Sequence, residues 1–331
     1  MENIKLSVIF ITYNHEKYVE KALRSVCEQE TDFAYEVVVG EDCSTDSTRD
    51  ILRRVADEYP DKVRLLFRDK NLGRPTLNVY ETTMECRGEY LAYLEGDDYW
   101  TDKCKLQKQM TFLEEHPEYI ACTHDCVMIA ENGDEIKDEA ILKIGDMYKW
   151  SGRFTYDDYK HSGKWPGHYA TLVSRNIYPA GKYDYTILHR AHDFVDDALI
   201  LLFLLIQGDI YRMDETMSAW RYVRKDTGTN WNSLSLKRDL VKDDCYLNTT
   251  MTKWVEDAVG LTDHAAIRCK KDFETALKMY LRKPCKENHK FLKDMFEYNI
   301  KHVVMKDKKT SLFVYSVKCM IQKLFRKKSV I

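Results

Sequence analysis

The chain has few glycines and prolines and no long apolar run. Its 331 residues include 13 Gly and 6 Pro, too few for a collagen-like, linker-rich or low-complexity protein. The longest uninterrupted apolar run is 198–206, far short of the roughly 20 residues that a membrane-crossing helix needs. Hydrophobic residues make up 44% of the sequence and aromatic residues 12%. We therefore expect a packed globular chain, with room for one large α/β domain and an extension.

The ten cysteines contain no C-x-x-C pair, and we find no signal peptide ahead of them. This pattern predicts a reducing, cytoplasmic environment. Cys122, His124 and Cys126 are close together, but their apolar segment lacks a second pair of ligands. Buried thiols and a histidine at a strand end are therefore favoured over a zinc site.

The net charge of −3 conceals an uneven distribution. Residues 1–250 contain 32 Lys and Arg against 45 Asp and Glu, whereas residues 251–331 contain 19 against 9. An acidic main body argues against nucleic acid as a partner. The basic C-terminal part suits either an anionic membrane surface or simple solvation.

The first part of the chain alternates between short apolar runs and helical patterns. Runs rich in β-branched and aromatic residues predict strands at 7–12, 36–39, 63–67 and 90–94. The segments between them predict helices at 16–28, 47–59 and 75–86. This alternation is typical of βαβ units, so we expect an α/β fold with a mostly parallel sheet.

Polar and acidic residues follow three of these strands. They are Thr12, Tyr13 and Asn14 after the first, Glu41 and Asp42 after the second, and Glu95, Asp97 and Asp98 after the fourth. The carboxyl ends of parallel strands form the ligand-binding edge of such a sheet. Carboxylates gathered there suit Mg²⁺ or Mn²⁺ together with a nucleotide diphosphate. The chain has neither a G-x-x-x-x-G-K-[ST] loop nor a G-x-G-x-x-G loop after the first strand, which disfavours P-loop enzymes and dinucleotide dehydrogenases.

The second half of the chain is less regular. It predicts a helix at 105–116, strands at 119–129 and 169–174, an apolar helix at 198–207, and strands at 210–213 and 218–222. Asp196 and Asp197 precede the apolar helix, where acidic residues often serve as caps. Beyond residue 236 the pattern is helical, with amphipathic stretches at 263–283 and 286–305. We expect domains at 1–232 and 233–331.

Four sequence blocks resemble the ordered motifs of family 2 glycosyltransferases. They are residues 7–14, residues 39–46, Asn71-Leu72-Gly73, and residues 88–100 with Glu95-Gly96-Asp97-Asp98. The resemblance is close over 5–118 and looser to about 232. It implies a GT-A fold and an inverting transfer of sugar from a nucleotide sugar to an acceptor hydroxyl.

The resemblance also implies roles for individual residues. Thr12, Tyr13, Asn14, Glu41, Asp42 and Asn71 match positions on the nucleotide side. Glu95 and Asp97 match the two acids of the D-x-D motif, with Asp97 as the direct metal ligand. Glu95 replaces the usual first Asp, so its contact, with ribose or with the metal, is left open. Asp197, or else Asp196, resembles the catalytic base, and a helix cap is the alternative for this pair.

Two further groups of residues match less fully. Arg221 or Arg224 would bind diphosphate where the family often has a Tyr-Arg-x-His-like stretch, although the histidine is missing here and surface arginines are the alternative. Trp165, His168 and Tyr169 lie where such enzymes form the acceptor side, with packing as the alternative for the tryptophan.

The segment 312–328 interleaves apolar and basic residues, as in a helix that lies in a membrane interface. A helix packed on the catalytic domain or on another subunit fits the same pattern, and the oligomeric state is open.

We expect a metal-dependent transferase for surface polysaccharide such as O-antigen or capsule, with UDP-sugar as donor and a saccharide or lipid-linked saccharide as acceptor. It would act in the cytoplasm or on the cytoplasmic face of the inner membrane. The alternative is a non-catalytic protein of the same fold that binds sugar nucleotides or scaffolds a membrane.

Overall fold

The computed structural model describes residues 4–162, 164–195, 197–225, 233, 236, 238–261 and 264–299. The chain divides into two compact units, residues 1–237 and residues 238–331. The first unit contains every strand of the described residues, and the second contains only helices within them. The domain limits 1–232 and 233–331 stay a prediction.

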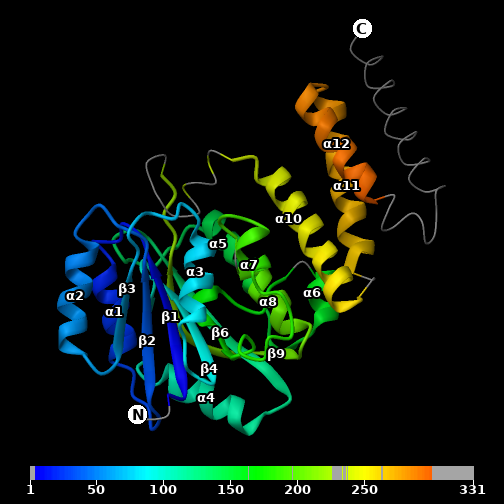
Figure 1. Ribbon diagram of the computed structural model, residues 1–331. Coiled ribbons are helices and arrows are strands. Elements are labelled where there is room, and N and C mark those ends of the chain that lie inside the picture. The colour runs from blue at the N-terminus through cyan, green and yellow to red at the C-terminus, as the bar shows by residue number, and fades with distance from the viewer. Residues whose placement is uncertain are drawn as a thin grey trace. The chain divides into compact units, whose positions relative to one another are not determined.

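A nine-stranded mixed sheet forms the centre of the first unit (Figure 1). Its order is β3-β2-β1-β4-β8-β6-β9-β5, and β7 pairs with β9. The first four strands are mutually parallel, as expected, whereas β8 runs antiparallel to both β4 and β6. The strands are β1 (Leu6–Thr12), β2 (Tyr35–Glu41), β3 (Val63–Phe67), β4 (Tyr90–Glu95), β5 (Tyr99–Trp100), β6 (Tyr119–Ile129), β7 (Gly152–Phe154), β8 (Val173–Arg175) and β9 (Asp209–Arg221).

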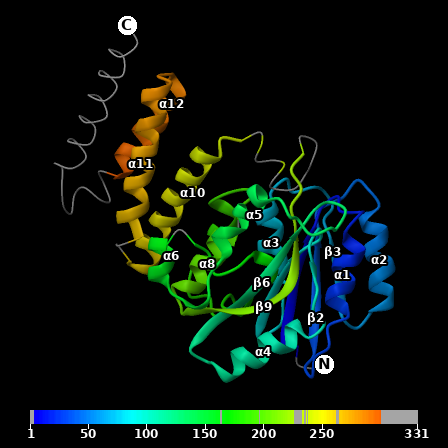
Figure 2. The same ribbon diagram turned by 180° about the vertical axis from the view of Figure 1, so that it is seen from behind.

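Helices cover both faces of the parallel part of the sheet (Figures 1 and 2). Side chains of α1, α2 and α4 share one apolar core with Val8 and Phe10 of β1, whereas α3 contacts β1 and β2. Strands covered on both faces can be apolar throughout, and every residue of β1 is buried. The helices of this unit are α1 (Val19–Cys27), α2 (Thr48–Glu58), α3 (Pro75–Met84), α4 (Lys105–Glu115), α5 (Glu139–Gly145), α6 (Tyr156–Ser162), α7 (Ile187–Arg190) and α8 (Asp197–Leu205). The mixed α/β architecture confirms the fold class expected from the sequence.

Three predicted elements of the second half were wrong in detail. The strand expected at 169–174 is a 3-10 turn, η2 (Tyr169–Thr171), followed by the short β8. The two strands expected at 210–213 and 218–222 are one strand, β9, whose pairing with β6 contains register shifts. Because of these shifts, a polar and exposed stretch is part of the same strand. The alternation of apolar and polar residues in the sequence does not reveal this continuity.

The second unit is helical in its described part, as the sequence predicted. It contains α10 (Leu240–Trp254), the π-helical turn η4 (Val255–Val259), α11 (His264–Arg282) and α12 (Lys286–Asn299). A small core of Cys245, Ala276, Phe291 and Met295 holds these helices together. The segment 312–328 lies outside the described residues.

Candidate active site

The strand register brings the predicted site residues to one edge of the sheet. Thr12, the last residue of β1, is the register partner of Glu41 at the end of β2. Its neighbour Ile11 pairs with Glu95 at the end of β4. Because the three strands are parallel, the loops that follow them leave the sheet side by side.

Glu95, Asp97 and Asp98 form a compact acidic cluster on the loop after β4. Their carboxylate oxygens lie within 4.8 Å of one another, and this is the group in the described part of the chain with the spacing of a metal site. Asp97 is 8% exposed and Asp98 is 1% exposed. Burial, together with the charge of Asp97, raises the pKa of Asp98 well above its usual value. Carboxylates this close repel one another unless a proton or a cation is shared among them.

One carboxylate oxygen without a hydrogen-bond partner in the described ranges indicates that this cluster suits a cation rather than a shared proton. Oδ1 of Asp98 accepts a hydrogen bond from the main-chain N–H of Arg221 at 2.7 Å, but its buried Oδ2 has no hydrogen-bond partner among the residues that the structure describes. A buried carboxylate oxygen without a donor is costly. Oxygen donors from several carboxylates are what Mg²⁺ and Mn²⁺ prefer. The donor set therefore fits a hard divalent cation held by Asp97 with Glu95 and, beyond the sequence prediction, Asp98.

Arg221 holds the main chain around the cluster. Its side chain is buried, and Nε donates to the carbonyl of Asp97 at 2.9 Å. Nη1 donates to the carbonyls of Ala130 at 2.9 Å and Glu131 at 2.7 Å, and the guanidinium lies 4.4 Å from the ring centre of Tyr18. The expectation of a surface arginine is wrong, because three main-chain carbonyls and an aromatic ring surround this side chain. Its hydrogen bonds fix the turn that carries the acids, and the predicted contact with phosphate has no support in this arrangement.

Gly96 allows the acidic turn to lie close to β1. A Cβ atom at this position would be 2.5 Å from Oγ1 of Thr12 and 3.0 Å from Nδ1 of His15. Only glycine fits between the acids without displacing these neighbours. His15 also lies near the cluster, with Nε2 4.0 Å from Oδ2 of Asp97.

Asp42 and Asn71 are joined on the side where the nucleotide was expected. Oδ1 of Asp42 accepts from the N–H of Leu72 at 2.7 Å, and Nδ2 of Asn71 donates to Oδ2 of Asp42 at 3.2 Å. Burial raises the pKa of Asp42 to about 6. The structure thus brings both residues together.

Glu41 and Asn14 hold the neighbouring loop. Glu41 is completely buried, and its carboxylate accepts from the N–H of Ser44 at 2.5 Å and from Nε of Arg49. Asn14 adopts a left-handed φ of 55° and accepts from the N–H of Thr45 at 2.8 Å. The predicted ligand contact of Glu41 is not favoured by its burial. Tyr13 is half-buried beside them.

Asp197 is the first residue of α8, whereas Asp196 lies outside the described residues. Oδ1 of Asp197 accepts from the adjacent N–H of Ala198 at 2.8 Å, which differs from the usual capping bond to the second or third helical N–H. Burial raises the pKa of Asp197 to about 6. A carboxylate with this pKa is ionised at neutral pH and takes up a proton more readily than an ordinary aspartate, as a general base must.

Tyr148 is a buried side chain whose pKa is influenced by the charges of both Asp197 and the acidic cluster, and sequence reasoning missed it. Burial raises the pKa of Tyr148 well above its usual value, and the negative charges of Asp197, Glu95 and Asp98 contribute in the same direction. The phenol therefore lies within electrostatic range of both groups. Tyr148 follows the short α5 in η1 (Asp146–Tyr148), in a stretch whose sequence has no clear periodicity.

The three residues expected on the acceptor side occupy different environments. His168 is 8% exposed, stacks on Trp220 at 4.6 Å between ring centres, and has a pKa lowered to about 3 by burial. Tyr169 is buried against Tyr93, with ring centres 5.1 Å apart. Trp165 is half-buried, 6.5 Å from the ring of Tyr148. The structure brings His168 next to the acidic cluster, since Nδ1 lies 3.9 Å from Oδ2 of Asp98, but Tyr169 is in a packing position.

His124 is in the middle of β6 and not at a strand end, which corrects one expectation. It is 1% exposed, and Nδ1 lies 2.7 Å from the carbonyl oxygen of Asp125. Cys122 is buried and Cys126 is partly buried on the same strand.

Comparison with known proteins agrees with this geometry. Residues 7–171, which contain β1 to β6 and the acidic cluster, match the family described as Glycosyl transferase family 2. The chain belongs to this family. The predicted resemblance is thereby confirmed, and the motifs quoted from the sequence, from the end of β1 to the acidic turn, lie within the matched residues.

Relatives of this family 2 glycosyltransferase match over about a third of the chain. Rv1520 of Mycobacterium tuberculosis is 42% identical over 128 residues, which cover 39% of this chain and 37% of Rv1520. The putative teichuronic acid biosynthesis glycosyltransferase TuaG of Bacillus subtilis is 34% identical over 110 residues, covering 33% of this chain and 42% of TuaG. The chain thus spans less than half the length of these relatives.

One solved structure shares the fold over nearly the whole chain. Residues 1–349 of Staphylococcus aureus TarS, in complex with UDP-GlcNAc, align with a TM-score of 0.64 and 18% identity. The alignment covers 90% of this family 2 glycosyltransferase and 82% of that chain. At this identity the likeness shows the GT-A fold alone.

Proposed function

We propose that this protein is an inverting, metal-dependent glycosyltransferase that moves a hexosyl or N-acetylhexosaminyl group from a UDP-sugar to an acceptor hydroxyl. The observation that carries the proposal is the acidic cluster of Glu95, Asp97 and Asp98 with Asp197, as a candidate base, in electrostatic range of the same tyrosine. A protein that only binds sugar nucleotides has no need of a base with a raised pKa.

The donor nucleotide would bind along the edge formed by Thr12, Tyr13, Asn14, Asp42 and Asn71. Asp42 offers a carboxylate held by two donors from the Asn71–Leu72 turn, suited to hydroxyls of ribose or N–H groups of a base. TarS has been crystallised with UDP-GlcNAc and with UDP, which supports UDP as the nucleotide here. The roles of individual residues on this edge are part of the proposal.

Asp97, Glu95 and Asp98 would hold the divalent cation. When bound, Mg²⁺ or Mn²⁺ would neutralise the charge of the diphosphate as it leaves. The chain itself would hold three carboxylates close together despite their mutual repulsion. Arg221 fixes the main chain that carries them. Such a group of acids has no stabilising role of its own.

Asp197 would accept the proton of the acceptor hydroxyl. The hydroxyl oxygen then forms a bond to the anomeric carbon on the face opposite the diphosphate, the bond from that carbon to the diphosphate oxygen breaks, and UDP leaves with the electron pair. Attack from the opposite face inverts the anomeric configuration. A base at the first residue of a helix is rigid enough to remain within hydrogen-bond reach of the hydroxyl.

The acceptor would be a saccharide or a lipid-linked saccharide of a surface polysaccharide such as O-antigen or capsule. The name of TuaG, a teichuronic acid biosynthesis glycosyltransferase, supports this class. None of the helices in the described ranges combines the length and the apolar character needed to cross a bilayer. The basic segment 312–328 supports peripheral contact with anionic lipid, and hence a place in the cytoplasm on the inner face of the membrane.

The test is to compare binding and transfer in Asp197→Asn and the unchanged protein, using UDP-hexose and UDP-N-acetylhexosamine donors. Asn cannot accept the proton, so transfer should fall by about 10²-fold or more while UDP affinity stays within about twofold. Normal transfer by Asp197→Asn would show that the base lies elsewhere. Binding of a UDP-sugar without hydrolysis or transfer in the unchanged protein would favour the non-catalytic alternative.

A further inference from the structure

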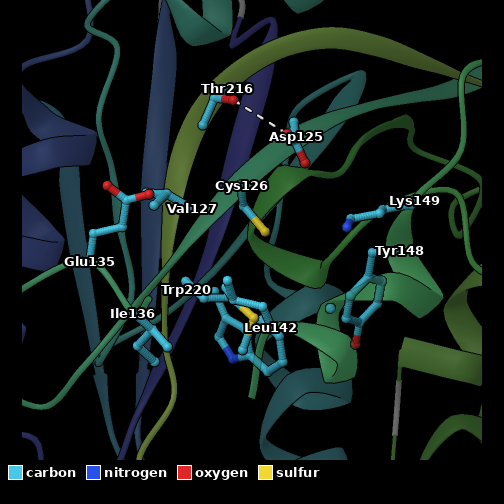
Figure 3. A pocket seen from close by; sticks show the side chains of 12 residues that line it. Asp125, Cys126, Val127, Glu135, Ile136, Leu142, Tyr148, Lys149, Thr216 and Trp220 are labelled. Carbon is cyan, nitrogen blue, oxygen red and sulfur yellow. Dashed lines mark hydrogen bonds between the residues drawn. The ribbon is translucent and has the colours of Figure 1, made fainter. Parts of the chain in front are cut away.

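A cavity of about 420 Å³ lies between β6, β9 and the segment made by α5 and η1 (Figure 3). Cys126 and Met128 of β6, Thr216 and Trp220 of β9, and Tyr148 are among its lining residues. Its volume is within the range of small-molecule sites. These residues were not assigned to the nucleotide or the metal above, although Tyr148 lies within electrostatic range of the acidic cluster.

An aromatic layer joins this cavity to the acidic cluster. Trp220 and Tyr148 line the cavity, with ring centres 5.8 Å apart and planes at 87°. His168 stacks on Trp220, lies 5.4 Å from Tyr148, and has Nδ1 3.9 Å from Oδ2 of Asp98. A ligand in the cavity is therefore one layer of rings away from the carboxylates.

The polar groups of the cavity indicate the chemistry of its ligand. The carboxylate of Glu135 is exposed at the cavity and has no hydrogen-bond or ion-pair partner in the part of the chain that the structure describes. Asp125 is held at 2.7 Å by Nη2 of Arg212 and contacts Oγ1 of Thr216 at 3.4 Å. The single lysine, Lys149, is paired with Asp146 at 2.7 Å.

Among the lining residues the acid Asp125 and the lysine Lys149 are both paired, whereas the carboxylate of Glu135 is not. This lining disfavours a phosphate-bearing ligand, because Glu135 would repel a dianion and no unpaired cation would offset it. Carboxylates accept hydrogen bonds from hydroxyl groups. The faces of Trp and Tyr rings pack against apolar C–H surfaces while their polar edges bind water or hydroxyls. A neutral, polyhydroxylated ring with apolar faces satisfies both kinds of surface.

We propose that this cavity binds a neutral saccharide unit of the acceptor, distal to the hydroxyl that is glycosylated. The proposal rests on the proposed function, since it assigns a subsite to the acceptor of that reaction. The rings of Tyr148 and Trp220, which line the cavity, would then pack against this unit. The carboxylate of Glu135 would accept hydrogen bonds from its hydroxyls.

Saturation-transfer NMR on the full chain with Mg²⁺ and UDP tests this assignment. The probes are cellobiose, lactose and N,N′-diacetylchitobiose, with ribitol 5-phosphate as an anionic comparison. We expect at least one disaccharide to receive saturation and ribitol 5-phosphate to receive little. Glu135→Ala removes the free carboxylate and Thr216→Trp fills the exposed rim, so each should lower the disaccharide signal by about fivefold or more. Glu139→Ala, on the exposed start of α5, is the matched control and should leave the signal unchanged.

Titration with UDP on the same samples separates the two proposals. UDP affinity should stay within about twofold in all three variants. No disaccharide signal in the unchanged protein, a signal that persists in both cavity variants, or stronger saturation of ribitol 5-phosphate would each overturn the saccharide subsite, even when UDP binds normally. Failure of UDP to bind the unchanged protein would instead contradict the proposed function.

Discussion

The main-chain N–H of Arg221 donates a 2.7 Å hydrogen bond to Oδ1 of Asp98, while the side chain of Arg221 bonds the carbonyl of Asp97 at 2.9 Å. One residue at the end of β9 thereby fixes two consecutive acids after β4. Because Oδ2 of Asp98 has no hydrogen-bond partner in the described part of the chain, this carboxylate oxygen is available to bind a cation. It gives the arginine a structural role.

We predict that Arg221→Met destabilises the first unit and also weakens binding of UDP with metal. The carbonyls of Asp97 and Glu131 lose the donor that Arg221 supplies, and the carbonyl of Ala130 keeps only the N–H of Gly133. We expect a cost of about 2–4 kcal/mol in the free energy of unfolding. Urea unfolding measures the loss, with Arg224→Met, at the exposed neighbouring arginine, as the control. Unchanged stability combined with lost UDP affinity would show that Arg221 is a phosphate ligand after all.

The raised pKa of Asp197 predicts how transfer depends on pH. The base must be ionised, and burial puts its pKa at about 6. The rate at saturating donor should therefore fall about tenfold per pH unit below 6 and level off above it. A rate that is flat from pH 5 to pH 7, with the protein folded throughout, is incompatible with this residue as the base.

Lys105 offers a test of electrostatics in the core of the first unit. It is completely buried, its ammonium lies 4.0 Å from the ring centre of Trp100, and within the described ranges its Nζ has no hydrogen-bond partner. Burial lowers the pKa of Lys105 to about 7, against 10.5 for the ordinary side chain. Between these values the unfolded chain binds more protons than the folded one, so stability should rise with pH from about 7 to about 10.5.

We predict that Lys105→Met stabilises the protein at pH 7 by about 1–4 kcal/mol and removes this dependence on pH. Thermal unfolding at pH 7 and pH 9 measures both effects, and Lys103→Met, at an exposed lysine, is the control. Equal stability of Lys105→Met and the unchanged protein at both pH values would mean that the ammonium is well solvated.

The sequence predicted those parts of the site whose position follows from the order of the strands. Parallel strands place their carboxyl ends together, so Thr12, Asp42 and Asp97 could be assigned to one edge from strand order alone. Gly96 belongs to the same edge, where the acidic turn passes so close to Thr12 that a side chain at position 96 would collide with it.

The parts that the sequence did not reveal depend on contacts between distant segments. Tyr148 reaches the site through ring contacts with Trp220 and His168, and no periodic pattern surrounds it. The sequence does not indicate the structural role of Arg221, because its partners include the main-chain carbonyls of Ala130 and Glu131, which carry no sequence signal. The polar stretch inside β9 interrupts the alternation of a strand that is nevertheless continuous, because register shifts in its pairing with β6 accommodate it.

Calorimetric titration of UDP into the protein with and without Mn²⁺, in the unchanged chain and in Asp97→Asn, tests the proposed cation site most directly. We predict that Mn²⁺ strengthens UDP binding by about tenfold or more in the unchanged protein, and that Asp97→Asn abolishes this gain while metal-free affinity is equal or higher. Equal affinity with and without Mn²⁺ in the unchanged protein, or a full gain from Mn²⁺ in Asp97→Asn, would contradict a cation held by this cluster.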